Sequence, residues 1–189
     1  MAALRRKSSI PPKIDRPIAL VGMMGAGKTT VGRRLAAALN LPFFDADAEI
    51  EKAAGMSVSE LFEKHGEASF RRGEAQVIER LLAGGPIVLA TGGGALTHEG
   101  TRALIKERAF SIWIRADVDT LVKRATRRAT RPLLKQGDPK ETIARLLDAR
   151  TPFYSAADIA IDSRAGSHAR TVYAIIAALR DHHSKEPIR

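Results

Sequence analysis

The chain has 189 residues, 44% of them hydrophobic and 28% charged, and 31 Lys and Arg against 21 Asp and Glu give a formal net charge of +10. This length predicts one domain with a core large enough to fold without cross-links. The absence of cysteine excludes disulfides, thiolate metal sites and a cysteine nucleophile, and it favours the reducing cytoplasm. No apolar run reaches the roughly 18–20 residues that cross a bilayer, and no secretory signal follows the basic N-terminus.

The two ends of the chain differ in composition from its middle. Residues 1–16 hold five cations against one acid and show no hydrophobic period, which predicts a flexible basic leader. Residues 182–189 form a polar tail. We therefore expect a single domain over residues 17–181.

Within this domain, short apolar runs alternate with stretches of helical period, as in successive βαβ units. The runs predicted as strands are 17–21, 41–44, 86–90, 110–114 and 158–161. The stretches predicted as helices are 27–39, 57–65, 67–82, 101–108, 117–127, 140–150 and 167–180. Five buried strands joined by crossover helices predict an α/β fold, a three-layer sandwich around a five-stranded parallel sheet.

A glycine-rich loop follows the first strand. Residues 22–29 match G-x-x-x-x-G-K-[ST] between a predicted strand and a predicted helix, the context in which this motif binds a nucleoside triphosphate. Backbone N–H groups of such a loop converge on phosphate oxygens, while Lys28 reaches the outer phosphates and Thr29 can bind Mg²⁺. The alternative is a glycine-rich turn that matches by chance. The predicted nucleotide-binding residues are Gly25, Ala26, Gly27, Lys28, Thr29 and Thr30.

Two carboxylates, Asp45 and Asp47, follow the second strand. On an extended chain, residues two apart point to the same side, and the carboxyl ends of parallel strands open onto the ligand site. Asp45 could then hold a water of a magnesium ion, and Asp47 could accept hydrogen bonds from the hydroxyls of a phosphoryl acceptor. The alternative is an Asp that caps a helix from Ala48 onward.

Two further segments could bind an anionic substrate. Arg71 and Glu74 are spaced to pair on one helix, which would leave the guanidinium able to grip a carboxylate; the alternative is a surface ion pair. Gly92, Gly93 and Gly94 follow the third strand and let backbone N–H groups approach a ligand closely, although an ordinary turn would also explain them.

A basic segment comes later in the domain. Five cations lie within nine residues, from Lys123 to Arg131, and a stretch with two prolines and a glycine follows. This pattern predicts a mobile lid over about 124–139 that places an arginine on the transferring phosphoryl group. The alternative is a solvated cationic helix end. Stacking aromatics are absent from the segment, so we do not expect it to bind nucleic acid.

Taken together, the motifs resemble those of shikimate kinases from about Ile18 to Arg180. In chain order they are the phosphate loop followed by Gly-Arg-Arg-Leu, then Phe-Phe-Asp-Ala-Asp, Gly-Glu-x-x-Phe-Arg-x-x-Glu, Gly-Gly-Gly, Arg-Pro-Leu-Leu and Arg-x-Pro-x-Tyr. The resemblance implies a fold like that of P-loop nucleoside monophosphate kinases, with a mobile lid and substrate-binding helices over about 46–82. It also implies transfer of the γ-phosphoryl group of ATP to the 3-hydroxyl of shikimate.

The resemblance further implies roles for single residues on the substrate side. Asp47 would contact the shikimate hydroxyls, including the acceptor. Arg71 and Arg150 would hold the carboxylate, with a backbone contact from Gly93 in the triple-glycine loop.

On the nucleotide side, Arg131 would be the lid arginine and Arg124 would lie near the adenine. Thr29 would bind Mg²⁺ directly and Asp45 through water. Lys28, together with Asp47 and Arg131, would carry the catalysis.

Two alternative functions stay open. A gluconate kinase is also a P-loop enzyme that acts on a small acid, and a nucleotide-dependent switch could use the basic leader and the arginine cluster to bind nucleic acid. We expect shikimate and ATP as partners, Mg²⁺ as the cofactor, and a monomer in the cytoplasm without membrane or nucleic-acid partners.

Overall fold

The computed structural model describes residues 14–126, 137–163 and 168–183. Its centre is one sheet of five strands in the order β2-β3-β1-β4-β5, and every neighbouring pair runs parallel. The strands are β1 (Ile18–Val21), β2 (Phe43–Asp45), β3 (Val88–Ala90), β4 (Phe110–Arg115) and β5 (Ile159–Asp162). The predicted five-stranded parallel sheet is therefore confirmed.

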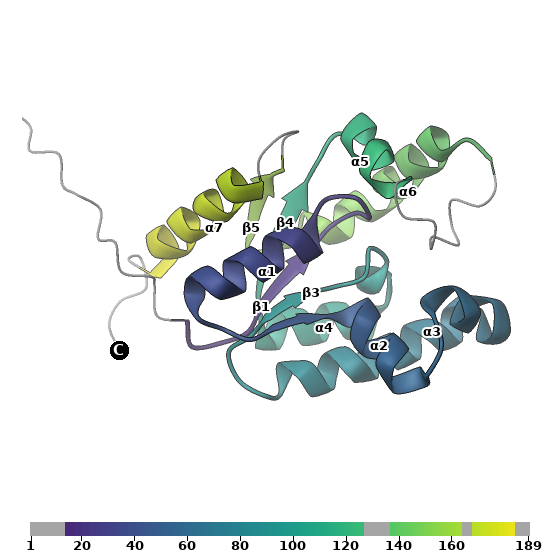
Figure 1. Cartoon of the computed structure of the whole chain (residues 1–189), viewed down its shortest axis with the longest axis horizontal. Helices are drawn as coiled ribbons and strands as arrows, with labels where there is room; N and C mark the ends of the chain where they lie inside the picture. The colour runs from purple at the N-terminus through teal and green to yellow at the C-terminus, as the bar shows by residue number, and fades with distance from the viewer. Residues whose placement is uncertain (1–13, 127–136, 164–167, 184–189) are drawn as a thin grey trace, which may run out of the picture.

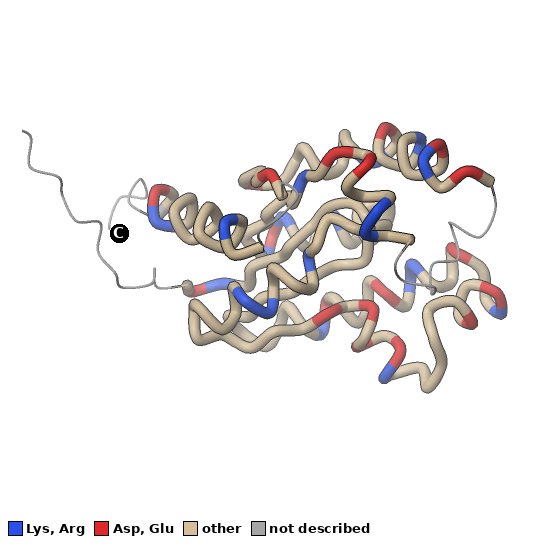
Figure 2. The backbone as a smooth tube through the Cα atoms, turned by 45° about the horizontal axis from the view of Figure 1, so that its top comes forward, with Lys and Arg blue, Asp and Glu red and all other residues tan. Residues whose placement is uncertain are grey.

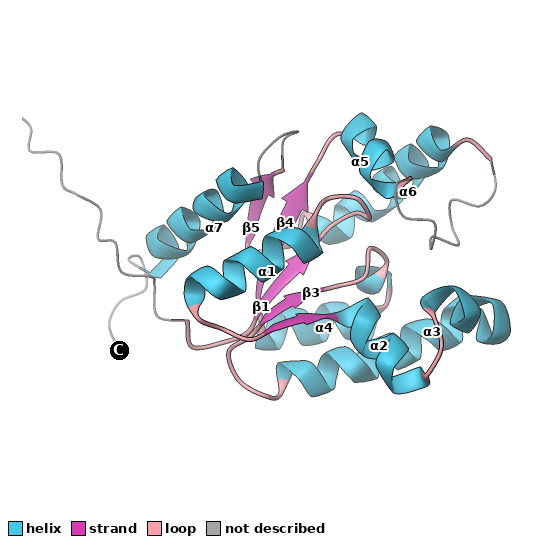
Figure 3. Ribbon diagram, viewed as in Figure 1, coloured by secondary structure: helices cyan, strands magenta, loops and turns pink. Residues whose placement is uncertain are grey.

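Helices cover both faces of this sheet (Figures 1 and 3). Helices α1 and α7 lie side by side on one face, whereas α4 and the second half of α3 lie on the other. The helices are α1 (Lys28–Leu39), α2 (Ala46–Ala54), α3 (Val58–Leu82), the short 3-10 helix η1 (Ala95–Thr97), α4 (Glu99–Arg108), α5 (Val118–Ala125), α6 (Pro139–Tyr154) and α7 (His168–His183). These layers confirm the α/β sandwich.

Burial explains why the strands are short, continuous apolar runs. All four residues of β1 and all three of β3 are buried, as expected for parallel strands covered on both faces. The register places Ile18 beside both Val88 and Phe110. Figure 2 shows charged residues of both signs along the helices and few on the central strands.

Capping signals in the sequence fix several helix starts. Ser57 and Glu60 form a complete capping box at the start of α3. Asp138 caps α6 ahead of Pro139, whose ring suits the first turn of a helix. Gly66 has a φ of 73° and interrupts α3, so the two helices predicted over 57–65 and 67–82 form one kinked element.

One prediction about the end of β2 is wrong. Helix α2 starts directly after the strand, within the range of 46–82 that the resemblance assigns to substrate-binding helices, although the periodicity predicted no separate helix there. Asp45 is its N-cap and Asp47 lies in its first turn. The two carboxylates therefore do not share one side of an extended chain. The alternative of a helix cap holds for Asp45, although the helix begins at Ala46 and not at Ala48.

The ends of the described chain pack on the domain. Ile14 contacts the core, and the guanidinium of Arg16 lies 5.5 Å from the centre of the Phe110 ring. His182 meets the same ring edge-on. Residues 14–16, which the sequence assigns to the leader, thus contact the folded part. Within the described residues, no helix combines the length and hydropathy of a membrane span.

Candidate active site

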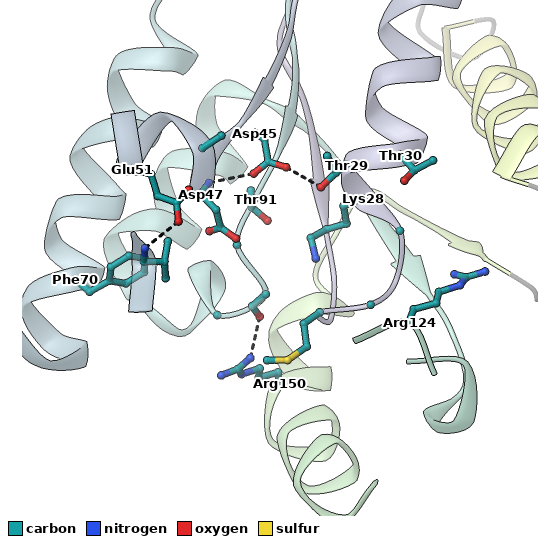
Figure 4. A pocket seen from close by; sticks show the side chains of 18 of the residues that line it. Lys28, Thr29, Thr30, Asp45, Asp47, Glu51, Phe70, Thr91, Arg124 and Arg150 are labelled. Carbon is teal, nitrogen blue, oxygen red and sulfur yellow. Dashed lines mark hydrogen bonds between the residues drawn. The ribbon is translucent and has the colours of Figure 1, made fainter. Parts of the chain in front are cut away.

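A cavity of about 710 Å³ opens at the carboxyl ends of the central strands (Figure 4). It is bounded by the loops after β1 and β3, by the start of α2, and by side chains from α3, α5, α6 and α7. Predicted site residues that line it are Gly25, Gly27, Lys28, Thr29, Thr30, Asp45, Asp47, Arg71, Gly92, Gly93, Gly94, Arg124 and Arg150. Ala26 is fully buried, and Arg131, like residues 127–136 of the predicted lid, lies outside the described residues.

The phosphate loop is wrapped tightly around its own lysine. Lys28 is buried, and its Nζ donates hydrogen bonds to the carbonyl oxygens of Gly22 at 2.7 Å and Met23 at 3.0 Å. Gly27 caps α1 with a φ of 97°, in the left-handed region that glycine adopts without strain. The loop therefore leads into a helix N-terminus, whose dipole and N–H groups favour anions.

A hydroxyl and a carboxylate meet beside this loop. Thr29 Oγ1 donates to Asp45 Oδ2 at 2.7 Å, and Asp45 Oδ1 accepts from the backbone N–H of Asp47 at 3.2 Å (Figure 4). Both side chains offer hard oxygen donors of the kind that Mg²⁺ prefers. The described residues contain no group of three or more His, Cys, Asp or Glu that could hold a metal ion. The donor set fits a magnesium ion held by few protein oxygens together with nucleotide phosphates and water.

Arg71 lies in a buried ion-pair network and not on the surface. Its Nη1 donates to Glu74 Oε2 at 2.6 Å, its Nη2 donates to Glu67 Oε1 at 3.1 Å, and the guanidinium lies over the rings of Phe62 and Phe70. Burial by itself would lower the pKa of Arg71, but the two glutamates together raise it. The alternative of a surface ion pair is wrong for Arg71 and Glu74, both of which are buried.

Glu74 is the most deeply buried charged group of the site. Its residue is 0% exposed, and Oε1 accepts no hydrogen bond from the residues that the structure describes. Burial raises the pKa of this carboxyl, and Arg71 acts in the opposite direction. The sequence predicted the pairing with Arg71, whereas the burial follows only from the packing of α3 under the triple-glycine loop.

Each glycine of that loop lies where a side chain would collide. A Cβ on Gly92 would lie 2.5 Å from Glu74 Oε1 and 2.9 Å from Asp47 Oδ1. A Cβ on Gly94 would overlap the Arg71 guanidinium, and one on Gly93 would lie 2.9 Å from the backbone nitrogen of Met24. The three glycines therefore do more than form an ordinary turn, because their lack of side chains lets the triple-glycine loop pack against α3 and the phosphate loop.

Two arginines hold loops at opposite sides of the cavity. Arg150 from α6 is 5% exposed and donates to the carbonyl oxygen of Gly93 at 3.2 Å. Arg124 from α5 donates to the carbonyl oxygen of Ala26 at 3.3 Å and to Ser163 Oγ at 3.1 Å. Figure 4 shows Arg150 below the glycine loop and Arg124 on the far side of the phosphate loop.

Several residues of the cavity wall were not predicted from the sequence, and His168 is the one with a shifted pKa among them. His168, to which no chemistry was assigned, begins α7 and lines the cavity beside Gly27, where its Nε2 lies 3.2 Å from the place of a Cβ. Burial lowers the pKa of His168, and the positive charges of Arg124 and Arg34 lower it further. Its position just beyond the last parallel strand is the only signal that could have pointed to it.

Comparison with known proteins identifies the family. The model of the family described as "Shikimate kinase" matches residues 24–180. This chain belongs to the shikimate kinase family. A shikimate kinase of Bradyrhizobium diazoefficiens is 59% identical over 167 residues, which cover 88% of this chain and 81% of the relative. Another from Rhodopseudomonas palustris is 58% identical over 168 residues, with 89% and 83% covered.

Solved structures agree with this membership. The shikimate kinase of Acinetobacter baumannii in complex with shikimate has a TM-score of 0.87 and 37% identity, and the match covers 90% of this chain and 96% of that one. A gluconokinase from Sinorhizobium meliloti has a TM-score of 0.62 at 18% identity over 93% of this chain and all of that one, which shows a shared fold alone. The predicted family and the nucleoside monophosphate kinase-like fold are confirmed.

Proposed function

We propose that the chain transfers the γ-phosphoryl group of ATP to the 3-hydroxyl group of shikimate, giving shikimate 3-phosphate and ADP. The observation that carries the proposal is a single cavity that joins an ATP-type phosphate loop to two buried arginines and Asp47, in a chain 59% identical to a shikimate kinase. Shikimate is a small acid with several hydroxyls, so it needs cationic groups at one end and a hydrogen-bond acceptor at the other.

The nucleotide end is assigned to the phosphate loop. Its backbone amides and Lys28 bind the phosphates, Arg124 lies near the adenine, and Arg131 of the lid completes the phosphate contacts. Thr29 would hold Mg²⁺ directly and Asp45 through water. When bound, the ion neutralises part of the phosphate charge.

The substrate end is assigned to three side chains and the glycine loop. Arg71 and Arg150 hold the shikimate carboxylate, with backbone contacts from residues 92–94. Asp47 lies beside Glu74 across the missing side chain of Gly92, so its carboxylate reaches the same part of the cavity as the arginine network. This position supports its role as acceptor of hydrogen bonds from the ring hydroxyls.

The transfer is direct and in line. Asp47 orients the attacking hydroxyl and takes up its proton as the bond from that oxygen to the γ-phosphorus forms and the bond from the γ-phosphorus to the bridging oxygen of the leaving ADP breaks. Lys28, the loop amides and Arg131 stabilise the charge on the transferring group, so most of the rate enhancement comes from alignment and electrostatics. Burial of Arg71 and Arg150 keeps water away from the substrate carboxylate and strengthens their interaction with it.

We further propose that the enzyme acts as a monomer in the cytoplasm, with ATP and shikimate as its partners and Mg²⁺ as its cofactor. The deciding experiment is ADP release with Mg²⁺ and ATP, in parallel with shikimate, gluconate or no acceptor. We expect turnover with shikimate alone and its loss when EDTA removes the metal. Turnover only with gluconate would overturn the roles of Arg71 and Arg150. Slow hydrolysis indifferent to both acids would contradict the proposed function as a whole, and salt-sensitive retention of nucleic acid would then be tested next.

A further inference from the structure

One buried hydroxyl lies between the two halves of the active site without any role in the chemistry above. Tyr154 is the last residue of α6, one turn after Arg150, and only 1% of it is exposed. Its O–H donates a hydrogen bond to the carbonyl oxygen of Gly93. The same oxygen accepts from Arg150 Nη1 at 3.2 Å. Two donors from one helix therefore hold a single peptide group of the triple-glycine loop.

The geometry of that peptide group links the hydrogen bond of Tyr154 to the direction of the next backbone N–H. The bond between Gly93 and Gly94 is trans and planar, so its carbonyl oxygen and its N–H point in opposite directions. Because the Gly93 oxygen points to α6, the Gly94 N–H is turned away from α6. Both glycines line the cavity. The hydroxyl of Tyr154 thus determines which backbone donor the loop can present to a ligand.

The same hydroxyl also contacts the nucleotide side. It lies 3.9 Å from the sulfur of Met23, and the ring lies 5.9 Å from that of Trp113, centre to centre. Met23 belongs to the phosphate loop, where its carbonyl oxygen accepts a hydrogen bond from Lys28. Burial, opposed by Arg150, raises the pKa of Tyr154 to about 12, so the hydroxyl stays protonated and remains a donor at working pH.

We propose that Tyr154 is a positioning residue for the substrate carboxylate, acting by holding the Gly93 carbonyl so that the Gly94 N–H and the Arg150 guanidinium both face shikimate. The inference rests on the proposed function. Without the hydroxyl, the Gly93 oxygen keeps only Arg150 as a donor among the described residues. The guanidinium is then drawn toward the loop at the expense of the substrate, and the peptide group is free to turn.

The test is Tyr154→Phe, with Tyr173→Phe as the matched control. These are the chain's two tyrosines, and Tyr173 is 75% exposed on α7. Phenylalanine keeps the ring beside that of Trp113 and removes only the oxygen. We expect Tyr154→Phe to raise the KM for shikimate by about 5- to 30-fold, the effect of one buried hydrogen bond. The KM for ATP should change less than about threefold, and Tyr173→Phe should change neither constant.

Two outcomes overturn the inference: an unchanged KM for shikimate, whatever happens to the melting temperature, or equal rises in KM for both substrates, which indicate a merely structural role. Wild-type turnover with shikimate is measured first, so failure of the proposed function appears there and not in the comparison of variants.

A second measurement needs no substitution and covers the case in which Tyr154→Phe folds poorly. With 3-fluorotyrosine incorporated at both positions, the fluorine resonance of Tyr154 should shift when shikimate is added, while that of Tyr173 should stay in place. Absence of a Tyr154 shift at saturating shikimate overturns the inference.

Discussion

Replacing Gly92 with alanine is the sharpest test of how the substrate side is packed. The new methyl group would lie 2.5 Å from Glu74 Oε1 and 2.9 Å from Asp47 Oδ1, distances at which one of the neighbours must move. Glu74 cannot yield easily, because it is fully buried and its other oxygen is 2.6 Å from Arg71. Overpacking of this kind costs about 1–3 kcal/mol, which lowers the melting temperature of a domain of this size by about 2–12 °C.

The same displacement should also weaken the binding of shikimate. If Glu74 moves, the guanidinium of Arg71 moves with it, and if Asp47 moves, the hydroxyl contact is lost. We expect shikimate to bind about 10- to 100-fold more weakly to Gly92→Ala, since either change removes at least one charged interaction. ATP binding should be nearly unchanged, because the phosphate loop is held by its own contacts.

Gly73→Ala provides the control from the helix that carries Arg71 and Glu74. A Cβ there meets nothing within 4 Å, so alanine should stabilise the helix by about 0.5–1 kcal/mol and raise the melting temperature by about 1–4 °C. Calorimetric titration with shikimate and thermal unfolding of both variants give the comparison. If Gly92→Ala binds shikimate as tightly as Gly73→Ala, the lack of a side chain at Gly92 is not what keeps the substrate side in place.

The remaining predictions concern charge. Arg150→Ala should weaken shikimate binding by several kcal/mol, the cost of breaking a desolvated charge pair, with little change in ATP affinity; equal losses in titrations with both ligands would contradict the assignment. Lys28→Ala should lower kcat at least about 100-fold while shikimate still binds, and steady-state kinetics with near-normal kcat would rule out the role of this lysine. The pKa of His168 is lowered in the fold, so the unfolded chain binds more protons below the ordinary pKa of 6.5 and stability should fall as the pH drops through that value. His168→Gln should therefore show a smaller fall in melting temperature between pH 7 and pH 5, and identical falls would speak against it.

The sequence predicts those parts of the site whose residues are close together in the chain. The phosphate loop is contiguous, so its strand, turn and helix could be predicted together, whereas the hydrogen bond from Lys28 Nζ to the Gly22 carbonyl oxygen is seen only in the structure. The five strands could be predicted because parallel strands buried on both faces are apolar throughout. Asp47 was assigned to the site, but the residue pattern kept it on an extended chain, because no loop separates α2 from β2, and only the resemblance placed helices over about 46–82.

Residues whose role depends on packing were harder to predict. The spacing of Arg71 and Glu74 shows that they can pair, but the same spacing occurs on exposed helices. Their burial depends on Gly92 and Gly94, which come from a different strand-to-helix connection. His168 belongs to no local motif, and Tyr154 ends the Arg-x-Pro-x-Tyr motif, which assigns it no contact. They enter the site only because the topology brings the starts and ends of distant helices to one edge of the sheet.

The two substrate arginines are buried to a similar degree but are neutralised differently, which bears on how the site selects its ligand. Arg71 has Glu74 and Glu67 beside it and is a satisfied ion-pair partner before any ligand binds. The hydrogen bonds of Arg150 within the described part of the chain go to uncharged groups, the Gly93 carbonyl, the Met23 sulfur and the Tyr154 hydroxyl, and Glu74 acts on it only through its charge. A buried cation that hydrogen-bonds no carboxylate is costly, and a ligand carboxylate would reduce that cost. Arg150 should therefore contribute more than Arg71 to the preference for an acid over a neutral polyol, with both arginines holding the carboxylate as proposed above.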